Sequence, residues 1–495
     1  MKALPAPDRP YRIPKGKRET VHWATKELPA HDADEGFYRI CGVKGSGKSH
    51  LTKLFILDAL REVESNPHAK LIVYEPKREF YSWIRSLNPK STINYFMPSD
   101  RRSVALSFTK DYWTDQDSFT LALAFYPYDP NERQRFWGDS LRTIYASVHM
   151  AIKKRLGRVD LRLMCLVIEE ESYTRQILGY DPYLVQARKL LEDHGDAIGD
   201  TKQNILMTIH SRIAEMKVIA AHMDRARRKN GTFSIVDFVK KPNSGIFVVS
   251  KDSRFRTTQD PMNGVLFLRL VDILDSQQRD PRRKVFVVID EFPTLAGDNP
   301  CPGITDMFLR LRSRGVTVFL TYQAHTTLKR IYGPEATEHI GQCTNIIYLR
   351  QADVESAQYA ESDLGRVEGT EQMPSTSFGA GGWSIGQSTQ KSERPRFTYT
   401  YLKNDMKKAS PLTGIQGVAM SPEHSEGTWP FVYSPRQIDA IPRTDHEAFP
   451  EYERRGKKSQ RLRPLTEREK KALGLVDKPP PNNQAKRKPN YPPTV

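Results

Sequence analysis

Gly42-Val43-Lys44-Gly45-Ser46-Gly47-Lys48-Ser49 is the stretch that decides the fold of this 495-residue chain. It matches the full pattern of a phosphate-binding loop. Residues 36–41 before it have the composition of a short strand, and residues 51–63 after it have helical apolar spacing. The motif requires this order of strand, loop and helix. Its glycines let the backbone curl until several N–H groups converge on a phosphate at the positive end of the helix.

The motif assigns chemistry to individual side chains. We expect Lys48 to reach the β- and γ-phosphates of ATP, and we expect the Ser49 hydroxyl to bind Mg²⁺. The other nucleotide-binding positions that we predict are Gly42, Gly45, Ser46 and Gly47.

A phosphate-binding loop needs a distant carboxylate, and the apolar run 285–289 ends in Asp290-Glu291. We predict that Asp290 holds Mg²⁺ and that Glu291 orients and deprotonates the attacking water. The next predicted strand, 316–320, leads to Gln323, whose amide is then expected beside Glu291 to sense the γ-phosphate. A glutamine at a strand end is also an ordinary surface residue, so this last assignment depends on the strand order.

A rival carboxylate pair, Glu169-Glu170, follows the apolar run 163–168. It lacks an aspartate, and its helical pattern continues to Ile177. We therefore assign this rival to a helix.

Strands that alternate with helices predict an α/β fold with a mostly parallel sheet, here a RecA-like P-loop NTPase core. Asp290 lies 242 positions after Lys48, which is farther than such a core needs, so an inserted domain is required. The predicted organisation starts with a basic N-terminal arm (1–33) and a nucleotide-binding domain in two parts (34–155 and 235–450). An all-α insertion (156–234) separates these parts. A flexible loop (366–396) and a basic proline-rich tail (451–495) complete the chain.

The charge of the chain is unevenly distributed. Its net charge is +17, but residues 454–495 hold +10 and residues 1–30 hold +4, which leaves +3 for residues 31–453. The tail is expected to be extended and mobile apart from a short helix near 467–473. It is either a solubilising segment or an arm that touches nucleic acid or an acidic partner.

Other features exclude some classes of protein. The longest apolar runs are far shorter than the roughly 20 residues of a membrane helix, so no direct membrane span is expected. No apolar stretch follows the basic N-terminus, which argues against a secretory signal. The four cysteines lack metal or disulfide spacing, as in a reducing cytoplasm.

The sequence resembles the type IV coupling proteins of bacterial conjugation, of the TraD and TrwB kind, within the wider FtsK and HerA group of ring-forming DNA motors. The resemblance covers roughly residues 36–445. Beyond the nucleotide motifs, it depends on the order and spacing of several weaker landmarks: 74–80, 136–137, 232–238, 312–315, 331–333 and 353–357.

The resemblance implies a homohexamer that hydrolyses ATP and moves DNA without sequence preference into a type IV secretion channel. Relaxase and a separate membrane component are then partners, and the protein is cytoplasmic or peripheral at the inner membrane. ATP lies between subunits in such rings, so Arg312 is expected to reach a neighbour's γ-phosphate, with Arg310 and Arg314 as alternatives. The simpler interpretation is that Arg312 is an exposed arginine at the end of a helix.

Two departures from the family pattern stand out. Membrane-bound members carry N-terminal transmembrane helices, whereas this sequence starts with a basic arm. Glu75 and Arg78 replace the usual Asp and Gly, while Lys77 matches and is interpreted as a structural or interface residue. Two alternative functions stay open: a HerA- or FtsK-like DNA pump in a phage, chromosome or defence context, and a nucleotide-gated scaffold with little turnover.

Overall fold

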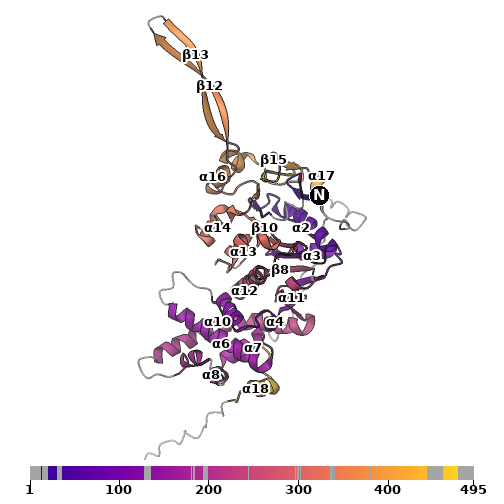
Figure 1. Cartoon of the computed structure of the whole chain (residues 1–495), viewed down its shortest axis with the longest axis vertical. Helices are drawn as coiled ribbons and strands as arrows, with labels where there is room; N and C mark the ends of the chain where they lie inside the picture. Colours follow the sequence, from indigo (N-terminus) through magenta and orange to yellow (C-terminus); the bar gives the residue numbers. More distant parts are fainter. Residues whose placement is uncertain are drawn as a thin grey trace, which may run out of the picture. The chain divides into compact units, whose positions relative to one another are not determined.

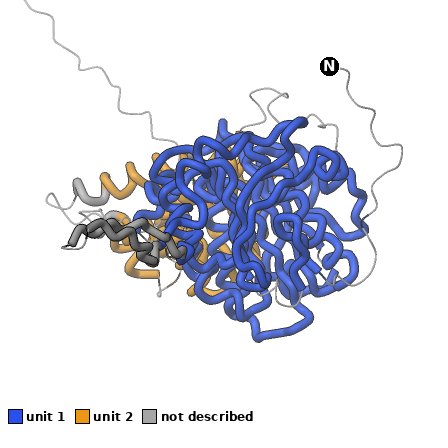
Figure 2. Tube along the Cα trace, turned by 90° about the horizontal axis from the view of Figure 1, so that it is seen from above, with its two compact units in different colours: residues 1–106, 226–454 blue, residues 107–225, 455–495 orange. Residues whose placement is uncertain are grey.

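The computed structural model describes residues 13, 20–29, 36–126, 135–179, 181, 184–192, 199–243, 245–295, 297, 300–301, 303–334, 338, 340–379, 382–442 and 461–477. The chain divides into two compact units, which Figure 2 distinguishes by colour. Unit 1 contains residues 1–106 and 226–454, and unit 2 contains residues 107–225 and 455–495.

Unit 1 is built on a nine-stranded sheet in the order β15-β14-β11-β3-β10-β9-β4-β8-β5. The strands from β11 to β5 are parallel, and β14 and β15 continue the sheet antiparallel. Their bounds, in chain order, are β3 Tyr38–Cys41, β4 Lys70–Glu75, β5 Ile93–Phe96, β8 Ile246–Ser250, β9 Val285–Ile289, β10 Val316–Tyr322, β11 Asn345–Tyr348, β14 Ile415–Met420 and β15 Thr428–Tyr433.

Helices cover both faces of this sheet, which explains why its central strands are continuous apolar runs. On one face, Phe55 of α2 (Lys48–Ser65) stacks on Phe319 of β10 with 4.4 Å between ring centroids. On the other face, Phe267 of α12 (Arg256–Asp275) lies edge-on to Tyr74 of β4 at 6.2 Å. Every residue of β9 and β10 is buried. The predicted mostly parallel α/β core is therefore confirmed (Figure 1).

The remaining elements of unit 1 are short and lie between these strands. They are α3 Phe80–Ser86, β6 Ala105–Leu106, β7 Thr232–Phe233, α11 Ile235–Lys240, η2 Ser253–Phe255, η3 Phe292–Thr294, α13 Ile304–Arg310, η4 Arg312–Arg314, α14 His325–Tyr332, α16 Val354–Asp363, η5 Tyr401–Asp405 and α17 Pro435–Asp439.

The predicted N-terminal arm, 1–33, includes a folded hairpin. The prediction that this whole segment is an arm is therefore wrong for the residues of the hairpin. Strands β1 (Thr20–Trp23) and β2 (Lys26–Pro29) pair antiparallel. Trp23 is buried and lies 4.9 Å from Tyr38 of β3, ring centroid to centroid. Burial of these apolar groups stabilises the hairpin on the core of unit 1. The basic residues of 1–12 lie outside the described residues.

All the regular secondary structure in the described residues of unit 2 is helical, and the unit is larger than the predicted insertion, 156–234. It starts at residue 107 because α5 and α6 pack on each other rather than on the sheet: Ser118 and His149 Nδ1 are 2.8 Å apart, and Phe125 contacts Tyr145. Periodicity identified the helix that became α6 but not the unit to which it belongs. The helices are α4 Phe108–Asp111, α5 Asp115–Phe125, α6 Arg135–Leu156, α7 Leu161–Glu169, α8 Glu171–Gly179, α9 Val185–Lys189, α18 Glu467–Leu473 and most of α10 Gly199–Asn230.

The predicted C-terminal tail, 451–495, contributes an ordered segment to unit 2. Helix α18 is present at the predicted place and begins with a capping box between Thr466 and Glu469. Glu469 is buried and accepts hydrogen bonds from Arg162 and, at 2.7 Å, from Arg158. Residues 461–477 are therefore packed rather than extended, while 478–495 lie outside the described residues.

The predicted flexible loop, 366–396, is instead a long antiparallel hairpin. Strands β12 (Arg366–Gly379) and β13 (Gly382–Pro395) pair over fourteen residues each and join no other strand among the described residues (Figure 1). Its low content of large apolar residues suggested a loop, but the ladder is formed by backbone pairing, which a polar composition does not prevent. None of the helices in the described part of the chain is long and apolar enough to cross a bilayer.

Candidate nucleotide site

The phosphate-binding loop joins β3 to α2 as the sequence predicted. Gly45 and Gly47 have positive φ angles of 79° and 104°, in the left-handed region that favours glycine. A Cβ atom on Gly47 would also lie 2.7 Å from Ile415 of β14, so a side chain there would displace the loop. Gly47 immediately precedes α2, so the loop presents its N–H groups at the positive end of an 18-residue helix.

Two polar side chains of the loop are buried at this place. Lys48 Nζ donates to the carbonyl oxygens of Gly42 and, at 3.1 Å, of Val43. Burial lowers the pKa of Lys48 because it penalises the charged form. The Ser46 hydroxyl is also buried, and none of the described residues provides it with a hydrogen-bond partner.

Asp290 lies directly after β9, within reach of the loop. Its Oδ1 accepts a hydrogen bond of 2.8 Å from the Thr321 hydroxyl, and its Oδ2 lies 3.4 Å from Lys77 Nζ. The carboxylate is almost completely buried. A buried carboxylate between a hydroxyl donor and an ammonium group is fixed in position and is a hard oxygen ligand suited to Mg²⁺.

Glu291 and Gln323 meet as the predicted strand order requires. Gln323 Nε2 donates to Glu291 Oε2 at 2.8 Å, because β10 lies beside β9 in the sheet. Glu291 has a φ of 55°, and its N–H donates to the Thr321 hydroxyl at 3.0 Å. Left-handed backbone at a non-glycine residue costs roughly 1–2 kcal/mol and recurs at functional sites. Burial raises the pKa of Glu291.

Arg312 lies at the opposite edge of the sheet. It belongs to η4, which precedes β10, whereas Asp290, Glu291 and Gln323 all follow the carboxyl ends of their strands. Arg312 is exposed, and no ion pair joins it to a described residue. The alternatives are engaged: Arg310 pairs with Asp306 at 3.2 Å, and Arg314 lies 3.8 Å from Asp275. Within one subunit, Arg312 is not part of the nucleotide site.

Thr321 is a site residue that our sequence analysis missed. Thr321 belongs to β10, and Gln323 is the first residue after that strand. The alternation of side chains along an extended chain places residues two positions apart on the same side of the sheet. The predicted order of β9 and β10 already placed Gln323 beside Glu291, and the same alternation could have placed Thr321 beside Asp290.

Glu75 and Arg78, which replace the usual Asp and Gly of the family pattern at and just after the end of β4, both have structural explanations. Glu75 is fully buried and accepts hydrogen bonds from the N–H groups of Phe80 and Tyr81, which begin α3. Arg78 has a φ of 61°, the conformation for which glycine is favoured, and its guanidinium lies 3.2 Å from Asp252. Both residues therefore order the loop that positions Lys77. The rival pair at Glu169 ends helix α7, as predicted.

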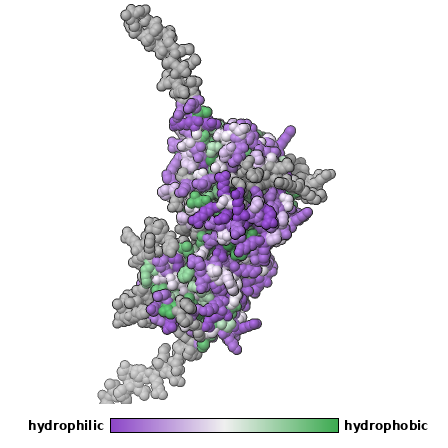
Figure 3. All heavy atoms as spheres, in the orientation of Figure 1, coloured by the Kyte–Doolittle hydropathy of each residue, from purple (hydrophilic) through white to green (hydrophobic). Residues whose placement is uncertain are grey.

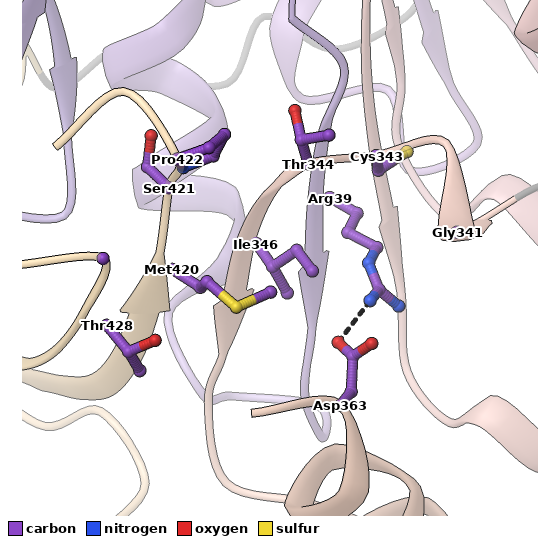
Figure 4. A pocket seen from close by; sticks show the side chains of 11 residues that line it. Arg39, Gly341, Cys343, Thr344, Ile346, Asp363, Met420, Ser421, Pro422 and Thr428 are labelled. Atoms are coloured by element: carbon purple, nitrogen blue, oxygen red, sulfur yellow. Dashed lines mark hydrogen bonds and ion pairs between the residues drawn. The ribbon is translucent and has the colours of Figure 1, made fainter. Parts of the chain in front are cut away.

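A separate cavity of about 420 Å³ lies at the amino end of β11 (Figure 4). Arg39 lines it and forms a 2.5 Å ion pair with Asp363, whose carboxylate also accepts from the Tyr348 hydroxyl. None of the predicted nucleotide-binding residues lines this cavity.

The residues present fit a magnesium nucleotide. The loop offers convergent N–H groups, a buried lysine and a buried serine hydroxyl without a described partner, and the neighbouring strands offer a fixed aspartate and a Gln-supported glutamate. This combination, on a mostly parallel sheet, defines a P-loop NTPase.

The chain belongs to the family described as the type IV secretion-system coupling protein DNA-binding domain, because the family model matches residues 25–423. Among curated proteins, no sequence matches the chain.

The fold is similar to solved structures of the bacterial conjugative coupling protein TrwB. An unbound form of TrwBΔN70 has a TM-score of 0.66 and 16% identity, over 87% of this chain and 91% of that chain. TrwB in complex with ADP and Mg²⁺ has a TM-score of 0.63 and 15% identity, over 84% and 89%. TrwB with a non-hydrolysable ATP analogue has a TM-score of 0.64 and 15% identity, over 85% and 92%.

Proposed function

We propose that this protein is an ATP-driven DNA translocase that couples a DNA or relaxase substrate to a type IV secretion channel. The observation that carries the proposal is the assembly of Lys48, Asp290, Glu291 and Gln323 at one edge of the sheet, in a chain that belongs to the coupling-protein family. The TrwB structures with nucleotides, among them one with ADP and Mg²⁺, support ATP and Mg²⁺ as ligands.

Each residue has a distinct part in hydrolysis. The loop N–H groups and Lys48 bind the β- and γ-phosphates, and Ser49 and Asp290 would hold the metal. Bound Mg²⁺ neutralises charge on the phosphate oxygens. Glu291 orients the attacking water and accepts its proton, while the Gln323 amide fixes the Glu291 carboxylate. An intact, supported Glu291 favours turnover over a nucleotide-gated scaffold.

A homohexamer would complete this site. Arg312 lies on the edge opposite the nucleotide and is exposed, so it can reach a nucleotide only in a neighbouring subunit. An arginine supplied in this way can contribute roughly 10³- to 10⁵-fold to the rate. Relaxase and a membrane component of the secretion system are further proposed partners.

DNA-stimulated ATP hydrolysis tests the proposal. Lys48→Ala should abolish hydrolysis by removing the phosphate ligand. Glu291→Gln should lower it by roughly 10²- to 10⁴-fold and leave ATP bound, because the amide cannot accept a proton. Hydrolysis that is insensitive to added DNA would contradict the translocase assignment and favour the scaffold.

A further inference from the structure

The carboxyl ends of β4, β5 and β8 carry a basic surface in unit 1, which we call the basic edge. It consists of residues 76–79, 97–104, 226–230 and 251–256, and it holds ten Lys and Arg residues against three Asp and Glu residues. This surplus of seven exceeds the surplus of three of residues 31–453 as a whole. The rest of that stretch is therefore net acidic. Lys77 pairs with Asp290 and Lys251 with Asp260, both outside the four segments, which leaves a surplus of five on the basic edge.

Hydrogen bonds and ion pairs join the four segments into one surface. The Ser99 hydroxyl donates to Asp252 Oδ2 at 2.9 Å, and Arg78 Nη2 lies 3.2 Å from Asp252 Oδ1. Asn230, the last residue of α10, donates from Nδ2 to the carbonyl oxygens of Arg101 and Ser103 at 2.8 and 2.7 Å. The basic last turn of α10 is thus held beside the basic segment that follows β5.

Two arginines of the basic edge are clamped by an aspartate two residues earlier. Arg254 bonds Asp252 through Nε at 3.1 Å and Nη2 at 2.8 Å, and Arg102 bonds Asp100 through the same two nitrogens at 3.0 and 2.8 Å. Both aspartates are completely buried, whereas the Arg254 side chain is 45% exposed. The clamp therefore hides the negative charge and fixes the plane of a guanidinium that solvent can reach.

A fixed, exposed guanidinium suits phosphate, since its planar N–H groups match phosphate oxygens and less rotamer entropy is lost on binding. A protein partner fits this surface less well, because the cores of protein interfaces combine arginine with aromatic and apolar side chains. Among the described residues, none of the large exposed apolar side chains belongs to the basic edge. On the side of the molecule that Figure 3 displays, hydrophilic residues cover most of the coloured surface.

We propose that the basic edge binds the phosphate backbone of DNA without sequence preference. This proposal rests on the proposed translocase function and assigns DNA contacts to particular loops of its core. DNA would then lie against the same edge of the sheet that carries Asp290 and Glu291, because β4 and β9 are parallel neighbours.

The double variant Arg254→Gln with Arg256→Gln tests this proposal, and the chain contains a matched control. Asp280 clamps Arg282 through the same two nitrogens, both at 3.1 Å, in the segment before the amino end of β9. The control is therefore Arg279→Gln with Arg282→Gln, which removes two arginines at the opposite edge of the sheet. Binding of random-sequence single-stranded and duplex DNA is measured by fluorescence anisotropy at several salt concentrations.

We expect the Arg254/Arg256 variant to bind DNA at least 10-fold more weakly and to flatten the plot of log K against log salt by about one to two units. The control should match wild type. A second variant, Arg228→Gln with Lys229→Gln on the exposed end of α10, should flatten the slope in the same way without touching a clamp. The proposal would be overturned if both variants kept the wild-type salt slope. It would also be overturned if the variants lost the ATP hydrolysis that is measured without added DNA, because that result would indicate a subunit interface.

The failure of this proposal can be distinguished from failure of the proposed function. If DNA stimulates wild-type hydrolysis but both variants keep the wild-type slope, the basic edge is excluded and the translocase stands. If the variants flatten the salt dependence of DNA binding but DNA never stimulates wild-type hydrolysis, the basic edge binds DNA and the translocase assignment fails.

Discussion

Thr321 holds two candidate catalytic groups in place with one hydroxyl. The hydroxyl donates to Asp290 Oδ1 at 2.8 Å and accepts the N–H of Glu291 at 3.0 Å. The second bond stabilises the left-handed backbone at Glu291, and the first fixes the carboxylate that would hold the metal. A buried threonine at this position is therefore a positioning residue rather than a group that touches the reacting atoms.

We predict that Thr321→Val lowers kcat by roughly 10- to 100-fold, since the loss of a buried hydrogen bond costs about 1–3 kcal/mol. The apparent affinity for Mg²⁺ should fall as well, which a purely structural role would not cause. The control is Thr317→Val, the same change at a buried position of the same strand that is remote from the carboxylates. Equal effects of the two substitutions on the Mg²⁺ titration would refute the positioning role.

Helix α18 shows how an element can be misjudged from its composition. The surrounding segment is basic and proline-rich, yet Glu469 is buried with Arg162, and Arg162 also donates to the carbonyl oxygens of Arg463 and Pro464. Arg155 donates to the Leu473 carbonyl oxygen at 2.7 Å. These bonds make residues 461–477 part of unit 2, so deleting everything after 454 would remove a structural element together with the tail.

Two truncations should consequently behave differently. Removal of residues 478–495 should leave the amides of α7 and α10 as protected in hydrogen–deuterium exchange as in the intact chain. Removal of 455–495 should raise their exchange rates markedly, because Arg162 would stay buried without Glu469 and would keep only the more distant Asp224 carboxylate, 3.7 Å from its Nε. Equal protection in both truncated chains would show that α18 is dispensable.

Glu469 also predicts a pH dependence of unit 2. Burial acts to raise its pKa, but hydrogen bonds from the Thr466 N–H, Arg162 and Arg158 outweigh burial and lower the pKa to about 2. A depressed carboxyl pKa stabilises the folded state above the unfolded pKa, here near 4.5, and the contribution is lost as pH falls toward 2. Glu469→Gln should therefore destabilise unit 2 by about 2–3 kcal/mol at pH 7, with a penalty that shrinks below pH 4.

The control for Glu469 lies on the same helix. Glu467 is 89% exposed, so Glu467→Gln should change stability by less than about 0.5 kcal/mol at either pH. The free energy of unfolding from urea titrations at pH 7 and pH 3 checks both variants. A penalty for Glu469→Gln that is the same at the two pH values would contradict the ionised pairing.

The sequence-based predictions were most accurate where a local pattern and its physical cause coincide. The loop at 42–49, the apolar strand before Asp290 and the helical rival at Glu169 needed only local periodicity and glycine placement, and the structure has them as predicted. Periodicity identifies an element but not its partner, so it could not assign α6 to unit 2. Polar composition likewise could not distinguish the β12–β13 hairpin from a loop, because its pairing is settled by register over fourteen residues.

At the scale of the whole molecule, the proposed ring makes a prediction that one subunit cannot satisfy. Arg312→Ala should abolish hydrolysis but spare ATP binding, since Arg312 is remote from the nucleotide of its own subunit. Mixing it with Lys48→Ala should restore part of the activity, because an interface can then combine an intact loop with an intact arginine. Arg310→Ala, which removes an arginine already paired with Asp306, serves as the control. A mixture as inactive as its components would exclude action across an interface.

The paired strands β12 and β13 have a consequence for detecting partners. In an isolated antiparallel pair, alternate N–H groups of each strand point away from the ladder, and no further strand joins either side among the described residues. Those amides should exchange with solvent far faster than their neighbours inside the ladder. The hairpin therefore contains its own reporter: a protein that adds a strand to either side would slow exchange at every second residue, and this spacing would reveal which side is occupied.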